Sequence, residues 1–256
     1  MKQFLAFFYK ECLELMRTGK LFILTIIFVF CGIMNPGLAK LTPWIMEMAS
    51  DSMGNTGIVI TEVNVDAMTS WAQFYKNVPI VIIVFLVIFS GTLANEYQKG
   101  TLINMVTKGL SRRKIVLSKL SIMIIVWTVL YWLSFFITYG YNEFYWDNSI
   151  AKNLFFGAFC IYIMGVWLIS VLIFAQVLFS TNISSLLITG VGFGIFYMIG
   201  LLTKIKDWLP TGLLQASELL SGVGCGGDYK VSIIVSVILV IINICASVVL
   251  FNKKTL

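Results

Sequence analysis

Residues 95–119, which read NEYQKGTLINMVTKGLSRRKIVLSK, are the stretch whose residue types and spacing indicate a function most directly. Thr101 can cap a short helix that Gly109 ends, and Ser111 can cap a second helix. The second helix begins with the basic residues Arg112, Arg113 and Lys114. The short helix carries more apolar surface than a connector needs, on Leu102, Ile103, Met105 and Val106. We therefore expect this loop to recognise a partner surface; a turn that only holds basic residues at anionic lipid headgroups is the alternative.

The chain lacks the side chains of the common catalytic and metal sites. Histidine is absent, which excludes serine–histidine and cysteine–histidine triads, the H-E-x-x-H metal site and a histidine proton relay. The five cysteines lie far apart, without a C-x-x-C pair, and are interpreted as small apolar residues. A G-x-x-x-x-G-K-[ST] loop for ATP is missing as well. We therefore predict no catalytic residue, no metal site and no cofactor bound by this chain.

The composition is that of a membrane protein. Of the 256 residues, 59% are hydrophobic and 12% are charged, against roughly a quarter charged in soluble domains, and the mean hydropathy is +0.93. A membrane-spanning helix needs about 20 mainly apolar residues, and six segments qualify. They are residues 21–39, 78–94, 120–139, 154–179, 186–202 and 231–251. The expected fold class is an all-α integral membrane protein with six transmembrane helices.

The charges between these spans predict their orientation. Residues 1–20, the loop 95–119 and the C-terminal tail are basic, whereas the loops on the opposite side are acidic or neutral. Since lysine and arginine favour the cytosolic side, both termini are predicted to be cytosolic. Topology thus explains the net charge of +6, and no nucleic acid partner is expected. A cleaved signal peptide is the alternative for the first span, but residues 1–20 are long and contain two glutamates.

The first 20 residues are patterned as an amphipathic helix. Apolar side chains recur at four-residue spacings, at Phe4, Phe8, Cys12 and Met16, while Arg17 lies on the polar side. We expect this helix to lie at the membrane surface as an elbow that orients the first span. It would form a unit of residues 1–20 before a six-span domain of residues 21–256. An ordinary solvated N-terminus is the alternative interpretation.

No span interior contains Asp, Glu, Lys or Arg. Ion-coupled carriers usually use such groups near the membrane midplane, so we infer that the energy for transport comes from outside the membrane. Sodium coordination by hydroxyl and carbonyl groups stays open. Polar residues in the spans can line a pathway or form hydrogen bonds between helices, and the second role is favoured. The pathway candidates are Ser90, Thr128, Gln176 and Asn243.

Two segments on the outer side are expected to be structured. Between the last two spans, Thr211 to Leu220 are apolar enough to dip into the outer leaflet, with Trp208 at the interface. A plain surface loop is the alternative for this piece. The acidic segment of residues 41–77 contains several aromatic residues and is expected to fold over the outer mouth.

Together these features resemble the permease subunits of type 2 ATP-binding-cassette (ABC) exporters, in their small bacterial branch. The resemblance extends over nearly the whole chain. It includes the N-terminal sequence K-E-x-x-E-x-x-R-T and, between spans two and three, Glu96, Gly100, Thr101, Leu102, Ser111, Arg112, Arg113 and Lys119. It implies that the short helix is a coupling helix that docks on the ATPase, and that the outer piece is a re-entrant hairpin. The residues implied in coupling are Glu96, Gly100, Thr101, Leu102, Met105, Gly109, Arg112, Arg113 and Lys114.

The resemblance also implies partners and an activity. Two permease subunits, identical or different, would form the pathway in the bacterial cytoplasmic membrane, and two separate ATPase subunits would bind ATP and Mg²⁺. The implied function is export of an amphiphilic substrate such as a drug, an antimicrobial peptide or a lipid, without enzymatic activity in this chain. Two alternatives stay open: a non-transporting membrane scaffold or immunity protein, and the substrate-binding membrane subunit of a vitamin importer.

Overall fold

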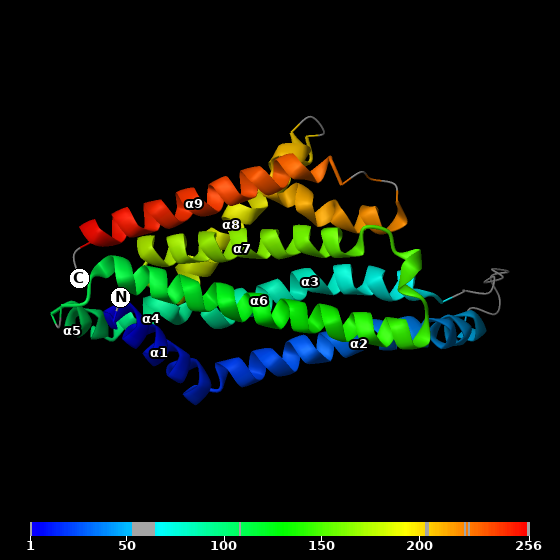
Figure 1. Ribbon diagram of the computed structural model, residues 1–256, viewed down its shortest axis with the longest axis horizontal. Helices are drawn as coiled ribbons and strands as arrows, with labels where there is room; N and C mark the ends of the chain where they lie inside the picture. The colour runs from blue at the N-terminus through cyan, green and yellow to red at the C-terminus, as the bar shows by residue number, and fades with distance from the viewer. Residues whose placement is uncertain are drawn as a thin grey trace.

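The computed structural model describes residues 2–52, 65–107, 109–202, 205–222, 224 and 226–254. Every regular element within these residues is helical. In chain order they are α1 (Lys2–Arg17), α2 (Lys20–Ser52), α3 (Ala67–Phe89), α4 (Gly91–Gln98), α5 (Thr101–Thr107), α6 (Arg112–Tyr145), η1 (Asn148–Ile150), α7 (Leu154–Leu178), α8 (Asn182–Gly200), η2 (Lys206–Trp208), η3 (Pro210–Ser221) and α9 (Tyr229–Lys253). Both chain ends lie at one end of the molecule, near α1 and α5 (Figure 1). We call this the terminal end and the opposite one the distal end.

Six of the described helical segments are long and apolar enough to cross a membrane, which confirms the predicted number of spans. They are Lys20–Ile45, Ala67–Gln98, Arg112–Tyr145, Leu154–Leu178, Asn182–Gly200 and Tyr229–Lys253. The long helices run lengthwise through one elongated bundle (Figure 1). The protein is therefore an all-helical, multi-pass membrane protein.

Three of these spans extend well beyond the boundaries predicted from hydropathy, among them Arg112–Tyr145, which was predicted as residues 120–139. Helix α2 passes through Pro36 and Pro43 to end at Ser52, although the apolar run stops near residue 39. The second span starts at Ala67 rather than at residue 78. Hydropathy marks the part of a helix that is immersed in lipid, and a helix continues past it wherever its backbone stays satisfied.

The first turns of α3 belong to the packed core. The carboxylate of Asp66 accepts a hydrogen bond from the Thr69 N–H at 3.0 Å and so starts the helix. The indole N–H of Trp71 donates to Asn148 Oδ1 at 2.9 Å, and this indole packs 5.2 Å from the ring of Phe135 in α6. This part of the predicted outer cover thus lies inside the bundle, while residues 53–64 lie outside the described residues.

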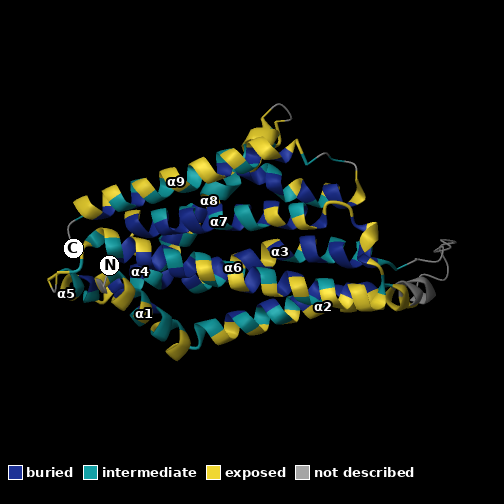
Figure 2. Ribbon diagram, in the orientation of Figure 1, coloured by how far each residue is buried: buried dark blue, intermediate teal, exposed yellow. Residues whose placement is uncertain are grey.

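An aromatic cluster joins α2, α3 and α6 in the middle of the bundle. The ring of Trp127 lies 6.0 Å from that of Phe28 and 5.4 Å from that of Phe85, both edge-to-face. Gly165 of α7 makes room for this indole, because a Cβ there would lie 2.3 Å from it. Helix α7 is the most buried of the six spans, whereas α8 and α9 are largely exposed on the outside of the bundle (Figure 2). Their apolar surfaces suit contact with lipid.

The piece between the last two spans is helical and packed at the distal end. Element η3 buries Leu213 and Leu219 completely. The Leu220 carbonyl accepts a hydrogen bond from the Lys152 N–H at 3.2 Å, just before α7. On the other side, Tyr229 of α9 donates its hydroxyl to a backbone carbonyl of η3 at 2.9 Å. Element η3 is therefore hydrogen-bonded both to the segment just before α7 and to α9.

Candidate functional site

A break between α3 and α4 positions the loop that the sequence singles out. Helix α3 ends at Phe89 and α4 begins at Gly91. Gln176 of α7 donates to the Phe89 carbonyl and accepts from the Leu93 N–H, both at 2.9 Å, and thereby satisfies backbone groups at the break. A Cβ at Gly91 would lie 2.4 Å from the Asn95 side chain, so glycine fits the bend. In this structure Gln176, which the sequence offered as a pathway candidate, forms hydrogen bonds from α7 to the end of α3 and the start of α4 at the break.

Helix α5 is the predicted short helix, and glycines flank it. Gly100 and Gly109 have φ angles of +64° and +85°, in the left-handed region that favours glycine. Leu102 is only 1% exposed and fixes α5 to the core, whereas the side chain of Ile103 is 47% exposed. Thr107 is exposed as well. Of the four predicted apolar residues of α5, Ile103 is therefore on the exposed side and Leu102 faces the core.

The two predicted capping residues, Thr101 and Ser111, lie at the starts of α5 and α6. Within the described residues, neither side chain forms the expected hydrogen bond to a backbone N–H of its helix. Ser111 occupies the N-cap position of α6 without a side-chain capping bond, and its carbonyl accepts from the Lys114 N–H at 2.9 Å. The hydroxyl of Thr101 donates to the Glu96 carbonyl at 3.3 Å. Thr101 therefore ties α5 back to α4. Met105 packs half-buried against the core.

The three basic residues that start α6 have different surroundings. The Arg112 guanidinium donates to the last carbonyls of α9 and its following turn, which lack helical partners. These carbonyls belong to Phe251, Asn252 and Lys254. Lys114 donates its ammonium to Gln3 Oε1 of α1 at 2.7 Å. Arg113 is exposed and makes no hydrogen bond or ion pair within the described residues, so it is the one of the three left for a partner.

Lys254 connects the end of α9 to α7 and α4. Its ammonium donates to the Val177 carbonyl at 2.7 Å and lies 4.3 Å from the centroid of the Tyr97 ring. That ring packs edge-to-face on Phe251, with 6.1 Å between centroids. Burial lowers the pKa of the Lys254 ammonium. The C-terminal residues and α4 are thus packed together at the terminal end.

A buried ion-pair network joins α1, α4 and α6. The Lys119 ammonium lies 3.0 Å from Glu11 Oε2 and 2.9 Å from Glu96 Oε2, the latter as an ion pair without an aligned hydrogen bond. It also donates to the Thr92 carbonyl at 2.9 Å. The side chain of Lys119 is 1% exposed. Lys10 completes the network, 2.9 Å from Glu11 and 3.0 Å from Glu96. We call Lys10, Glu11, Glu96 and Lys119 the ion-pair network.

Glu14 extends this network toward solvent. Its Oε2 lies 2.6 Å from the Lys10 ammonium. Burial disfavours the charged form of Lys10, but hydrogen bonds to Glu14 and Glu11 outweigh it and raise the pKa of Lys10. Burial likewise opposes ionisation of Glu14, and its hydrogen bond with Lys10 outweighs this effect and lowers the pKa of Glu14. Carboxylate oxygens of Glu11, Glu14 and Glu96 lie within 4.8 Å of one another, and the ammonium groups of Lys10 and Lys119 contact them.

The sequence patterns do not pair these charges, although one signal for Lys119 is present. Lys119 lies four residues after Ile115, three after Val116 and four before Met123, and these three side chains are fully buried. At helical spacing, Lys119 is therefore on the apolar face of α6. A lysine in that position requires an acidic partner when the helix packs. The identity of the partner, Glu11, depends on how α1 docks.

Helix α1 turns Phe7 and Glu11 toward the bundle. Its predicted apolar stripe lies beside this buried edge: Phe4, Phe8 and Cys12 are half-buried, and Met16 is 65% exposed. Arg17 is exposed. The bundle thus covers part of the stripe and leaves its end at Met16 exposed.

The remaining pathway candidates form hydrogen bonds within the bundle. The hydroxyl of Thr128 lies 2.8 Å from that of Tyr162 in α7. Asn243 of α9 donates to the Ser170 hydroxyl of α7 at 3.1 Å. Ser90 bonds to a carbonyl of the preceding turn of α3 at 2.8 Å. In this structure, Thr128 and Asn243 therefore form hydrogen bonds between helices.

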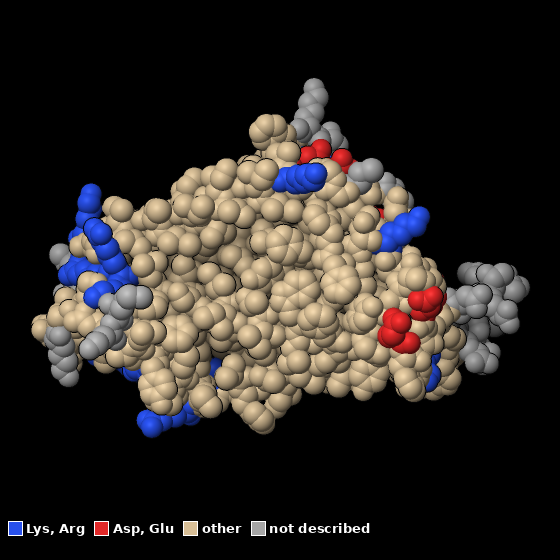
Figure 3. Space-filling model, viewed as in Figure 1, with Lys and Arg blue, Asp and Glu red and all other residues tan. Residues whose placement is uncertain are grey.

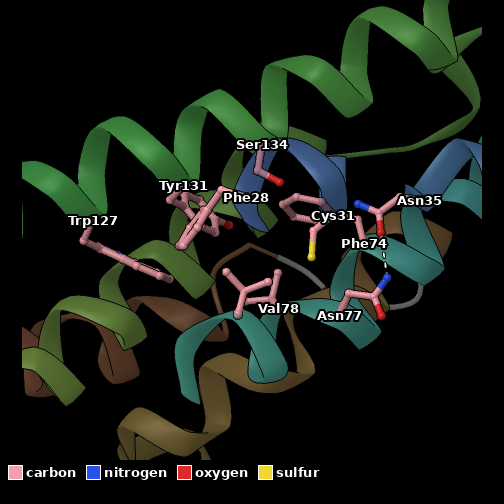
Figure 4. Close-up of a pocket in the computed structure, with 10 residues that line it drawn as sticks. Phe28, Cys31, Asn35, Phe74, Asn77, Val78, Trp127, Tyr131 and Ser134 are labelled. Carbon is pink, nitrogen blue, oxygen red and sulfur yellow. Dashed lines mark hydrogen bonds between the residues drawn. The ribbon is translucent and has the colours of Figure 1, made fainter. Parts of the chain in front are cut away.

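A small cavity lies among α2, α3 and α6 (Figure 4). Asn35 lines it, accepts from the Asn77 amide at 2.7 Å and donates to the Thr138 hydroxyl at 3.2 Å. Aromatic rings, including Trp127 and Tyr131, form the opposite wall. Its volume of about 10 Å³ holds about one water molecule. The cavity is thus a small, mainly apolar gap, and the two asparagines that line it, Asn35 and Asn77, bond to each other.

Comparison with known families decides the classification. The family described as ABC-2 family transporter protein matches residues 17–201, which is more than half of the chain. The chain belongs to the ABC-2 transporter family. Within this ABC-2 protein, the matched region contains α4, α5 and α6, with Glu96 and Lys119. Helix α9, η3 and nearly all of α1 lie outside it. Neither the curated proteins nor the solved structures contain a significant match to this chain.

Proposed function

We propose that this ABC-2 protein is the membrane permease subunit of an ABC exporter and that a separate ATPase subunit, which binds ATP and Mg²⁺, drives it. Family membership supports a transport role and an ABC ATPase as the general kind of partner. One observation carries the assignment of the docking element. Leu102 anchors α5 while Ile103 and Arg113 stay exposed, which suits a short helix that is rigidly held and free to bind.

The proposed orientation has the terminal end in the cytosol of a bacterium. On the face shown in Figure 3, the acidic side chains lie at the distal end and most of the basic ones at the terminal end. The positive-inside rule then favours cytosolic termini in the cytoplasmic membrane. In this orientation α5 faces the cytosol, where an ATPase would bind. Helix α1 would be the elbow helix at the inner surface, and η3 the re-entrant piece on the outer side.

The proposed mechanism couples closure of the ATPase subunits to movement of the spans. A force on α5 reaches α4 through the Thr101–Glu96 contact and reaches α6 through the Glu96–Lys119 ion pair. Because Lys119 also contacts Glu11, α1 would move with α6. A second permease subunit, identical or different, would complete the translocation pathway. The proposed cargo is amphiphilic, which suits the absence of charged residues from the apolar segments predicted from the sequence.

The test is a mild-detergent pull-down of the full chain from its native membrane, followed by mass spectrometry. We expect recovery of an ATPase with a Walker loop, and of any second permease. The variants Ile103→Asp and Arg113→Glu should lose the ATPase while keeping the elution profile of the wild type. Lys253→Glu is the matched control, because Lys253 is exposed at the same end but outside α5 and the start of α6.

Two outcomes would contradict the proposed function, and a third would contradict the proposed docking surface. Capture of no ATPase under conditions that preserve a known ABC complex would favour a non-transporting scaffold or immunity protein. Tight binding of a vitamin by the purified chain alone would favour the membrane subunit of an importer. Equal ATPase recovery with Ile103→Asp, Arg113→Glu and Lys253→Glu would place the docking surface elsewhere.

A further inference from the structure

A polar cavity of about 450 Å³ lies between α1, the start of α2, α4 and α5. Its size is within the roughly 300–1,000 Å³ of small-molecule sites. Lysine, glutamate, asparagine and threonine side chains form most of its wall, together with Leu15 and Met105. The ion-pair network forms its floor, since Lys10, Glu11 and Glu96 line it.

The charges that line this cavity are unevenly paired. The three carboxylates of Glu11, Glu14 and Glu96 share two ammonium groups, those of the network. Lys20 and Lys99 also line the cavity, and neither has a carboxylate within 4.0 Å among the described residues. Within 4.0 Å, the three carboxylates thus share two ammonium groups, whereas the ammonium groups of Lys20 and Lys99 have no carboxylate contact in the described part of the chain. Lys20 is still close enough to Glu14 for its charge to help lower the pKa of that carboxyl group. Glu14 is the most accessible of the three carboxylates, because its side chain is 50% exposed and the other two are 7% and 10% exposed, and its Oε2 contacts Lys10.

The cavity lies at the depth of lipid headgroups. Lys20 is the first residue of the span Lys20–Ile45, and Lys99 directly follows the span Ala67–Gln98. On α2, Ile23 and Phe30 are 50% and 62% exposed, and at helical spacing both lie within a quarter turn of Lys20 on the helix surface. They form an apolar surface where acyl chains of a lipid would run. A soluble phosphate compound would make no use of that surface.

We propose that this cavity binds a phospholipid whose headgroup carries both a phosphate and a primary ammonium, which is a phosphoethanolamine lipid. The phosphate accepts hydrogen bonds from Lys20 and Lys99, and the ammonium donates to Glu14. The acyl chains follow the exposed face of α2. A choline headgroup lacks the N–H donors for Glu14, and a glycerol headgroup lacks the positive charge. The bound lipid would fasten α1 and α2 to α4, whether or not the chain exports a substrate.

Native mass spectrometry of the full chain tests this site. The protein is reconstituted in nanodiscs of phosphatidylcholine that contain phosphatidylethanolamine, phosphatidylglycerol or neither, and then released in mild detergent. We expect retained phosphatidylethanolamine at least about ten-fold above phosphatidylglycerol at equal supply. The double variant Lys20→Gln with Lys99→Gln should lose this adduct, and Lys20→Arg with Lys99→Arg should keep it. The charge-matched control, Arg113→Gln with Lys253→Gln, should retain the lipid like the wild type.

Glu14→Gln separates the two halves of the site. This variant should lose the preference for phosphatidylethanolamine over phosphatidylglycerol while it still binds a phosphate. Equal retention of the lipids by the wild type, or an undiminished adduct in the Lys20 and Lys99 double glutamine variant, would overturn the proposal. Displacement of the lipid by millimolar inorganic phosphate would show a site for free phosphate instead. Stronger retention of phosphatidylglycerol than of phosphatidylethanolamine would overturn the assignment of the ammonium to Glu14.

Discussion

The ammonium of Lys119 lies 3.0 Å from the carboxylate of Glu11, although 108 positions separate the two residues in the chain. The contact fixes the N-terminal helix to the first turns of α6, and Glu96 adds α4 to the same lysine. Each of the three side chains is nearly buried. A charge in such surroundings is stable only while its partners are present, because burial removes the solvation that would replace them.

Replacement of Lys119 by methionine should therefore destabilise the protein strongly. It leaves Glu11 and Glu96 buried with one fewer cation, and loss of one partner of a buried ion pair costs about 3–5 kcal/mol. We expect a clearly lower thermal midpoint in detergent by tryptophan fluorescence. Lys114→Met serves as the control, because Lys114 bonds a single exposed glutamine side chain. Similar midpoints for both variants would mean that Lys119 contributes no more than a surface lysine.

The contact between Lys10 and Glu14 should hold over a wide pH range. The pKa of Glu14 is lowered, so its contribution is present above the ordinary value of 4.5 and is lost as the pH falls through the folded value. The pKa of Lys10 is raised, so its contribution is present below 10.5 and is lost only as the pH rises through the higher folded value. The difference in thermal midpoint between the wild type and Glu14→Gln should thus be constant from about pH 6 to pH 9. It should shrink as the pH falls below 4.5 and be lost as the pH passes through the lower folded value.

A double-mutant cycle supplies the control for this pH dependence. In a Lys10→Met background, Glu14→Gln should have a smaller effect at pH 7, since the two residues interact directly. A stability difference that persists unchanged at pH 3.5 would contradict the assignment. So would equal effects of Glu14→Gln with and without Lys10.

The six spans were predictable because each contains an apolar run long enough for the membrane, and this property needs no tertiary contact. The ends of the helices were less predictable. Polar or aromatic residues such as Trp71 continue α3 outward, and their burial depends on neighbours like Asn148 from a distant part of the chain. Gly100 and Gly109 mark the limits of α5 because their backbone conformation is a local property.

The candidate site was likewise only partly predictable from the sequence. A short apolar helix beside a basic cluster was visible in the sequence, but the side of α5 that packs inward was not, so Leu102 and Ile103 could not be told apart. Arg112 and Arg113 are adjacent and chemically identical, yet one bonds the end of α9 and the other is exposed. The pairing of Glu11 with Lys119 likewise follows from docking of α1, which no local pattern encodes.

Arg112→Ala should loosen the C-terminus of α9 without unfolding the bundle. The guanidinium holds carbonyls that lack helical partners, and a hydrogen bond to a charged group contributes about 1.5–3 kcal/mol. Because Arg112 is partly exposed, we expect a loss at the lower end of this range. Hydrogen exchange followed by mass spectrometry should show faster exchange at residues 249–254. Arg113→Ala should leave this exchange unchanged, and equal acceleration in both variants would exclude a capping role for Arg112.

Replacement by alanine should have different effects on protein stability at two glycines in adjacent helices, Gly165 of α7 and Gly190 of α8. A Cβ at Gly165 would lie 2.3 Å from the indole of Trp127, which is itself held between Phe28 and Phe85. Gly165→Ala should therefore destabilise the protein by about 1–3 kcal/mol, as overpacked cores do. At Gly190 no atom of the described residues lies within 4 Å of the added Cβ. Gly190→Ala should leave the stability unchanged or raise it by up to about 1 kcal/mol, because alanine restricts the unfolded backbone.

Steric trapping or thermal unfolding in the same detergent would measure both variants, and the change of sign is the informative quantity. Equal destabilisation by Gly165→Ala and Gly190→Ala would show that the loss of helix flexibility dominates over the local clash. A destabilised Gly190→Ala together with loss of a dimer on size exclusion would instead place another chain against the exposed face of α8. Relief of the clash by Trp127→Phe in the Gly165→Ala background would confirm that the indole is the colliding group, since the smaller ring removes the atoms nearest to the new methyl.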